Sequence, residues 1–151
     1  MPKPVRNLMG ILLLLTAMSM VAHAQSLKTT QAAPSEEFSF QVKDFKINHQ
    51  GENNVLNISI SYRYVANIAN ADYPDFRWLA KDVEPLLGNY PNKTDYWEIV
   101  NKQITALLMK KYPALASVTC ELKVEPSEHV PYSRSSRVTR TRRSATQRSG
   151  R

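Results

Sequence analysis

The stretch from Leu56 to Tyr64 constrains the fold more than any other, because apolar and polar residues alternate through it without interruption. The apolar positions are Leu56, Ile58, Ile60, Tyr62 and Tyr64, and the residues between them are Asn57, Ser59, Ser61 and Arg63. Successive side chains of a strand point to opposite faces of the sheet. The pattern therefore predicts a strand with one buried face and one solvated face.

A second alternating stretch precedes this strand and contains a slip. Phe38, Phe40 and Val42 share one parity, whereas Phe45 and Ile47 share the other. One extra residue in a strand has this effect, so we expect a β-bulge near residues 43–44. Residues 49–54 are rich in Gly and Asn and predict a turn that joins the two strands into a hairpin.

Two stretches with helical spacing follow. Pro74 is suited to the first position of the first helix, and Pro85 predicts a kink or an end late in it. The second stretch, residues 89–113, is the longest helical pattern after residue 24, with Thr94 or Asp95 as the expected N-cap. Its apolar side comprises Trp97, Val100, Ile104, Leu107, Leu108 and Tyr112, while Asn101, Lys102, Gln103 and Lys110 are assigned to the other side.

Alternation returns in residues 115–124, and residues 132–139 predict a fourth strand with a more polar pattern. The order strand, strand, helix, helix, strand, strand predicts an α+β fold (ββααββ). In it, two helices cover one face of a four-stranded, mostly antiparallel sheet. We assign this domain to residues 36–139.

The segments outside the domain predict export and a basic tail. Residues 1–24 combine a basic start, an apolar centre and a small-x-small cleavage site, so they are interpreted as a signal peptide of a periplasmic or secreted protein. An uncleaved membrane anchor is the alternative. Residues 25–35 predict a flexible linker and residues 140–151 a basic disordered tail. Residues 134–151 hold seven arginines and no acid, whereas residues 25–133 hold eleven basic and thirteen acidic residues. The tail is therefore a candidate for contact with an anionic partner such as lipid head groups.

Few residues of the chain suggest catalysis. The single cysteine, Cys120, alternates with polar residues and is expected to be a buried apolar residue, with a reactive or intermolecular thiol as the alternative. Ser127-Glu128-His129 contains hydrolase residue types, but no nucleophile-elbow motif is present. His49 and His129 are expected to be solvated. The sequence predicts no metal site and no cofactor.

Glu98 is the acidic residue of greatest interest, and it has two interpretations. In the first, it is either part of a capping box with Asp95, in which its carboxylate bonds to the N-cap amide, or a plainly solvated carboxylate. Alternatively, the carboxylate accepts two parallel N–H donors from a ligand, a geometry that suits an amino-pyrimidine edge.

The element order and three short patterns resemble dihydroneopterin aldolase, a member of the tunnelling-fold (T-fold) group with 6-pyruvoyl tetrahydropterin synthase and urate oxidase. The patterns are Asp75-Phe76-Arg77-Trp78-Leu79-Ala80, Tyr96-Trp97-Glu98-Ile99-Val100 and Leu122-Lys123-Val124-Glu125-Pro126. The resemblance implies sheets joined edge to edge in a homo-oligomeric barrel, with ligand sites between subunits. It also implies that Glu98 holds a pterin or purine ring, with Phe76 and Glu125 lining the site.

The sequence departs from the aldolase at two of these positions. The family has a lysine where Glu125 stands and a tyrosine where Phe76 stands. A carboxylate in place of an ammonium reverses the local charge, which disfavours an anionic intermediate of retro-aldol chemistry. The sequence therefore favours heterocycle binding over aldolase activity, and whether any reaction occurs stays open. The alternative function is a non-catalytic oligomeric surface module whose Arg-rich tail contacts an anionic partner.

Overall fold

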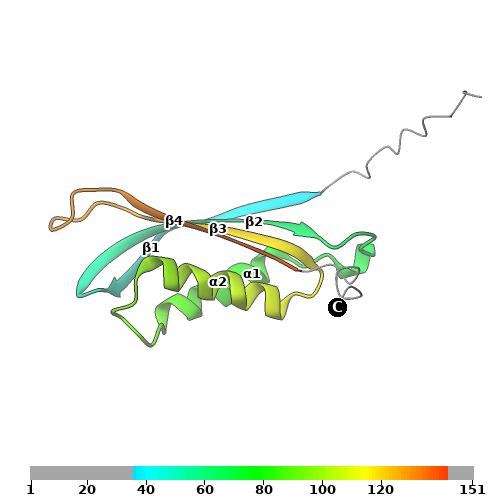
Figure 1. The fold of residues 1–151 in the computed structure, drawn as a ribbon, viewed down its shortest axis with the longest axis horizontal. Coiled ribbons are helices and arrows are strands. Elements are labelled where there is room, and N and C mark those ends of the chain that lie inside the picture. Colours follow the sequence, from blue (N-terminus) through cyan, green and yellow to red (C-terminus); the bar gives the residue numbers. More distant parts are fainter. Residues whose placement is uncertain (1–35, 143–151) are drawn as a thin grey trace, which may run out of the picture. The chain divides into compact units, whose positions relative to one another are not determined.

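A computed structural model describes residues 36–142, which form one four-stranded antiparallel sheet with strand order β1-β2-β3-β4. The elements are β1 (Glu37–His49), β2 (Glu52–Tyr64), the short 3-10 helix η1 (Asn70–Asp72), α1 (Phe76–Gly88), α2 (Trp97–Lys111), β3 (Leu115–Val124) and β4 (Arg134–Thr141). Both helices lie on the same face of the sheet (Figure 1), as the sequence predicts.

The hairpin forms as its sequence indicates. The register of β1 against β2 shifts between Val42 and Phe45, which confirms the predicted bulge, and Asp44 has a φ of 54°. The turn is tighter than residues 49–54, because only Gln50 (φ 55°) and Gly51 (φ 79°) lie outside the strands. Two consecutive positive φ angles suit the right-handed twist of a two-residue hairpin loop.

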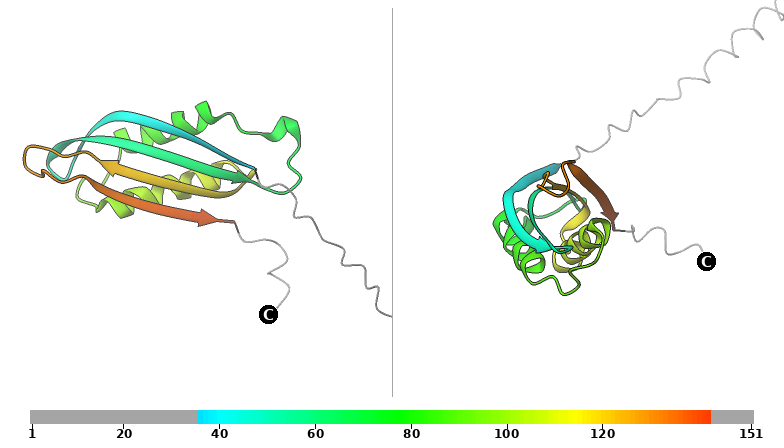
Figure 2. Two further views of the ribbon diagram at one scale, coloured as in Figure 1. Left: turned by 90° about the horizontal axis from the view of Figure 1, so that it is seen from above. Right: turned by 90° about the vertical axis from the view of Figure 1, so that its left-hand side faces the viewer.

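The core lies between the helices and the inner face of the sheet. Strand residues of one parity meet the apolar stripes of α1 and α2, and Figure 2 shows both helices running along the strands. The fully buried hydrophobic residues are Leu56, Ile58, Ile60, Leu79, Val83, Val100, Ile104, Leu108, Leu115, Val118, Cys120 and Leu122. None of the helices within residues 36–142 is long and apolar enough to cross a lipid bilayer.

Both helices start later than the sequence suggests. α1 begins at Phe76, two residues after Pro74, because the carboxylate of Asp75 accepts a hydrogen bond from the amide of Arg77 (2.9 Å) and caps the helix there. Pro85 lies inside α1, which continues to Gly88 with Asn89 as its C-cap, so of the two expected effects of this proline, a kink or an end, the end does not occur.

Asn101 is the clearest disagreement within α2. Its side chain is fully buried, although the sequence analysis assigns it to the polar side. It lies four residues after Trp97 and three before Ile104, so the helical period itself places it on the buried stripe. The amide Nδ2 donates to the backbone carbonyls of Cys120 in β3 (3.1 Å) and Ser136 in β4 (2.8 Å). The polar residue is buried because it supplies a donor to two carbonyl groups of the sheet.

The domain extends past its predicted C-terminal boundary, and the predicted segments outside it are not described by the structure. β4 runs to Thr141, two residues past the predicted domain boundary, and Arg142 bonds to the fold, so residues 140–142 belong to the domain. The predicted signal peptide (1–24), the linker (25–35) and the rest of the basic tail (143–151) lie outside the described residues.

Cys120 is expected to be unreactive in the folded protein. The residue is fully buried in β3, and burial raises the pKa of its thiol to about 12, with the nearby Glu121 charge adding to the shift. At pH 8 the folded protein should therefore not react with a thiol reagent, whereas urea-unfolded protein should react fully. Colorimetric thiol titration checks this, and rapid labelling of the native protein would favour the reactive-thiol alternative.

Candidate functional site

Glu98 lies exposed on the first turn of α2, and its carboxylate has no hydrogen bond or ion pair within residues 36–142. The carbonyl of Tyr96 accepts from the amides of Ile99 (2.9 Å) and Val100 (3.2 Å), so the amides of Trp97 and Glu98 are left without an intrahelical acceptor. The start of α2 therefore presents one free carboxylate acceptor next to two free amide donors.

The capping-box interpretation of Glu98 is wrong. The N-cap of α2 is Tyr96, which has no side-chain cap, and not Thr94 or Asp95. The Asp95 carboxylate instead accepts from the hydroxyl of Tyr90 (2.8 Å). Burial, together with this bond, raises the pKa of Tyr90 to about 12. The backbone amide of Asp95, to which Glu98 would bond in a capping box, donates instead to the carbonyl of Asn92 (3.2 Å).

His49 fixes the position of this helix start. It is fully buried at the end of β1, so the expectation of a solvated histidine is wrong. Its Nε2 donates to the carbonyl of Asp95 (2.8 Å), and its ring packs on Trp97 with the ring centroids 4.5 Å apart. The closed end of the hairpin thereby holds the residues on either side of the N-cap. Glu98 is the next residue in the chain after Trp97, so its position is fixed by these two contacts.

Two apolar side chains flank Glu98, and the sequence analysis did not select either as a site residue. Tyr96 is 70% exposed and Ile99 is 37% exposed. The sequence indicates this exposure, because helical spacing places Tyr96 and Ile99 outside the apolar face that contains Trp97 and Val100. Exposed apolar side chains beside an exposed carboxylate suit a flat ligand with polar edges.

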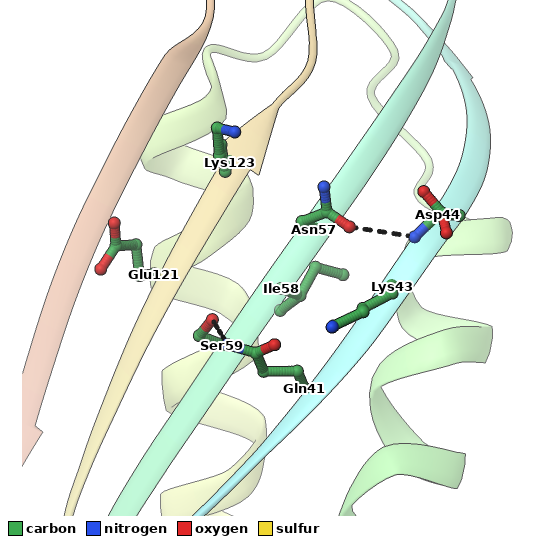
Figure 3. Close-up of a pocket in the computed structure, with 8 residues that line it drawn as sticks. All are labelled: Gln41, Lys43, Asp44, Asn57, Ile58, Ser59, Glu121 and Lys123. Atoms are coloured by element: carbon green, nitrogen blue, oxygen red, sulfur yellow. Dashed lines mark hydrogen bonds between the residues drawn. The ribbon is translucent and has the colours of Figure 1, made fainter.

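Glu125 lies on the helix-free face of the sheet, away from α2. Its Oε1 accepts from Asn57 Nδ2 (2.6 Å) and Lys123 Nζ (2.9 Å), and these bonds, that of Lys123 first, lower the pKa of its carboxyl. Asn57 and Lys123 line a shallow polar hollow of about 360 Å³ on this face (Figure 3). Within one chain, Glu125 is a surface group already satisfied by its own neighbours.

Phe76 occupies the opposite end of the domain from Glu98. Its ring stacks on Phe38 with centroids 5.5 Å apart, near the start of β1. Trp97, next to Glu98, packs on His49 at the end of the same strand. At about 3.3 Å per residue, the two contacts lie roughly 35 Å apart along β1. Glu98, Phe76 and Glu125 therefore do not meet within one chain, and a site that combines them requires a second copy.

The described residues contain no cluster that suits a metal ion. No group of three His, Cys, Asp or Glu side chains comes together within residues 36–142. His49 is buried against α2, whereas His129 lies exposed in the connection between β3 and β4.

Comparison with solved structures gives the fold. A dihydroneopterin aldolase from Burkholderia thailandensis, bound to guanine, superposes with a TM-score of 0.56 at 11% sequence identity, over 72% of this chain and 93% of that chain. The chain has the fold of dihydroneopterin aldolase. A provisionally named dihydroneopterin aldolase from Vibrio cholerae gives a TM-score of 0.58 at 12% identity, over 73% of this chain and 100% of that chain. The predicted T-fold architecture is confirmed by these similarities. No protein-family model and no curated protein matches the chain by sequence.

Proposed function

We propose that this T-fold protein is exported to the periplasm or secreted, and that it binds a flat pterin- or purine-type heterocycle between two copies of itself, with Glu98 as the anchor. The observation that carries the proposal is the free carboxylate of Glu98 beside the free amides of the α2 start. Guanine, the ligand of the Burkholderia structure, presents parallel N–H donors and a carbonyl acceptor on one edge. A carboxylate and a helix amide complement that edge.

A second copy can bind at the unpaired edges of the sheet. β1 and β4 are the outer strands, and each has an unpaired edge within the described residues. They run in opposite directions, so β4 of one copy can continue the antiparallel sheet into β1 of the next. α2 packs on β3 and β4, and α1 packs on β1. Such a joint brings α2, with Glu98, beside α1 of the neighbouring copy, which carries Phe76.

The proposed activity is binding rather than aldol cleavage. The position that holds a lysine in the aldolase family is Glu125 here, and its carboxylate is bonded to Asn57 and Lys123 on the helix-free face. A carboxylate held in this way does not supply the positive charge that an anionic intermediate requires.

Glu98→Gln is expected to weaken heterocycle binding by roughly 10- to 100-fold. The substitution keeps the shape but removes the charge and turns one of the two acceptors into a donor, and hydrogen bonds to charged groups contribute about 1.5–3 kcal/mol. Isothermal titration calorimetry with guanine, neopterin and 7,8-dihydroneopterin measures the affinity of the wild type and of the variant. Glu84→Gln, which neutralises an exposed carboxylate on α1, is the matched control. An absence of binding at millimolar ligand, or equal affinity in Glu98→Gln, would discard the proposal.

A further inference from the structure

A second hollow, of about 460 Å³, lies at the end of the domain where β4 finishes. The connection from Val65 to Pro74 forms one wall, and the turn from Tyr112 to Ala114 forms the other. The lining is largely apolar, with Ile68 and Pro113 among its residues, and Asp72 is its only charged side chain. The hollow is well separated from Glu98, because the C-terminal end of α2 and not its start borders it.

Asp72 has no cationic partner within residues 36–142, which distinguishes it from the neighbouring acids. Asp82 bonds to Lys111 and to the hydroxyl of Tyr112, and Asp75 pairs with Arg77. These ion pairs satisfy the other carboxylates around the hollow. The charge of Asp72 is therefore available to a cation that enters the hollow.

The chain leaves the described domain directly beside this hollow. The guanidinium of Arg142 donates to the carbonyls of Met109 (2.7 Å), Leu115 (3.1 Å) and Tyr112 (3.4 Å), and Tyr112 is itself part of the wall. The backbone amide of Arg142 also donates to the carbonyl of Ala116 (2.7 Å). These bonds hold Arg142, the last described residue before the tail, at the rim of the hollow.

The composition of residues 143–151 matches the hollow. Residues 143–151 contain three arginines and no acid. Nine residues reach about 30 Å when extended, so every one of these arginines can return to a wall that Arg142 already contacts. An arginine combines apolar methylene groups with a planar cation, which suits an apolar hollow that holds one carboxylate.

We propose that the hollow is a docking site for the chain's own C-terminal tail, residues 143–151. An arginine side chain of the tail enters it, with the guanidinium on the Asp72 carboxylate and the methylene groups against Ile68 and Pro113. The contact is intramolecular, so the high effective concentration of the tethered tail compensates for the weakness of a single exposed ion pair. The composition of the tail predicts an anionic partner, and under this proposal that partner is Asp72 of the same chain.

Hydrogen exchange of the full chain tests the docking. Amides of residues 65–74 are expected to exchange several-fold more slowly in the wild type than in Asp72→Asn or in the triple variant Arg143→Gln, Arg148→Gln, Arg151→Gln. The slowing should disappear for the wild type in 0.5 M NaCl, because salt screens the pair. Asp44→Asn, the same change on the helix-free side of β1, is the control and should match the wild type.

Equal exchange in the wild type and the triple variant would overturn the proposal, even if Asp72→Asn loosened its own connection. The choice between the chain's own tail and that of a second copy needs a covalent readout. With the three arginines replaced by lysine, a carbodiimide should join a tail lysine to Asp72, and the product should run as a monomer on a denaturing gel. Linkage of Asp72 only in a covalent dimer would overturn the intramolecular site.

Discussion

Replacing Asn101 with aspartate is expected to lower the free energy of unfolding by about 3–5 kcal/mol at pH 7, a large part of the stability of a domain this size. Asn101 is fully buried, and its Nδ2 faces the carbonyls of Cys120 and Ser136 at 3.1 and 2.8 Å. Aspartate preserves the size but replaces that donor with a negatively charged oxygen opposite two carbonyl oxygens. The introduced charge has neither solvent nor a cation to stabilise it.

The pH dependence of this variant identifies the cause of its defect. Burial beside two carbonyl oxygens raises the folded-state pKa of the introduced carboxyl above its unfolded value of about 3.9. Between the two pKa values the folded state binds more protons than the unfolded state, so the stability of the variant relative to the wild type rises as the pH falls. Urea unfolding of both proteins at pH 7 and pH 5 measures the difference. The same deficit at both pH values would contradict a charge-based defect.

Asn101→Leu is the matched control. Leucine has a similar volume and no charge, and it also removes Oδ1, which has no hydrogen-bond partner among residues 36–142. The remaining cost is the loss of two donor contacts to the sheet, roughly 1–3 kcal/mol, and it should not change between pH 7 and pH 5. Asn101 bonds to β4, the edge strand that the proposed assembly uses, so its loss should also weaken the oligomer.

The sequence predicts the layers of the fold because each layer depends on a local period. Alternation locates β2 and, through the slip between Val42 and Phe45, also the bulge in β1. The errors arise where contacts between distant residues decide the structure. Asn101 lies four residues after Trp97 and three before Ile104, so the helical period places it on the buried stripe of α2. Only its polar residue type argues for the solvated side, and its contacts with Cys120 and Ser136 explain why an amide is tolerated there. The pattern within the helix gives the position of the residue, but not the two carbonyl acceptors that satisfy a buried amide.

The start of α2 illustrates the same limit at the candidate site. Asp95 has the residue type of an N-cap, but Tyr90 and His49 from other segments engage its carboxylate and carbonyl. The sequence correctly places Glu98 in the first turn of α2, where it is exposed. Its grouping with Phe76 and Glu125 came from a resemblance to an assembly, and one chain cannot bring these residues together.

Replacing Trp97 with alanine is expected to cost about 3–5 kcal/mol, comparable to the effect at Asn101. Trp97 is only 8% exposed, and its ring lies 4.5 Å from that of His49. The pair packs the end of β1 against the start of α2, so alanine leaves a cavity at a contact that helps to fix both. Urea unfolding of the variant measures the loss, and a cost below about 1 kcal/mol would contradict this role.

Trp97→Phe separates packing from hydrogen bonding at the same position. The indole Nε1 of Trp97 has no hydrogen-bond partner in the described part of the chain, so phenylalanine loses volume but no polar contact. We expect a cost of only about 1–2 kcal/mol. If phenylalanine cost as much as alanine, the indole N–H would have to make a bond that the packing of residues 36–142 does not provide.

Trp97 also precedes Glu98 in the chain, so the two variants carry a functional test. Under conditions where both are folded, heterocycle affinity should fall in Trp97→Ala and be nearly kept in Trp97→Phe, because only alanine releases the helix turn that orients the Glu98 carboxylate.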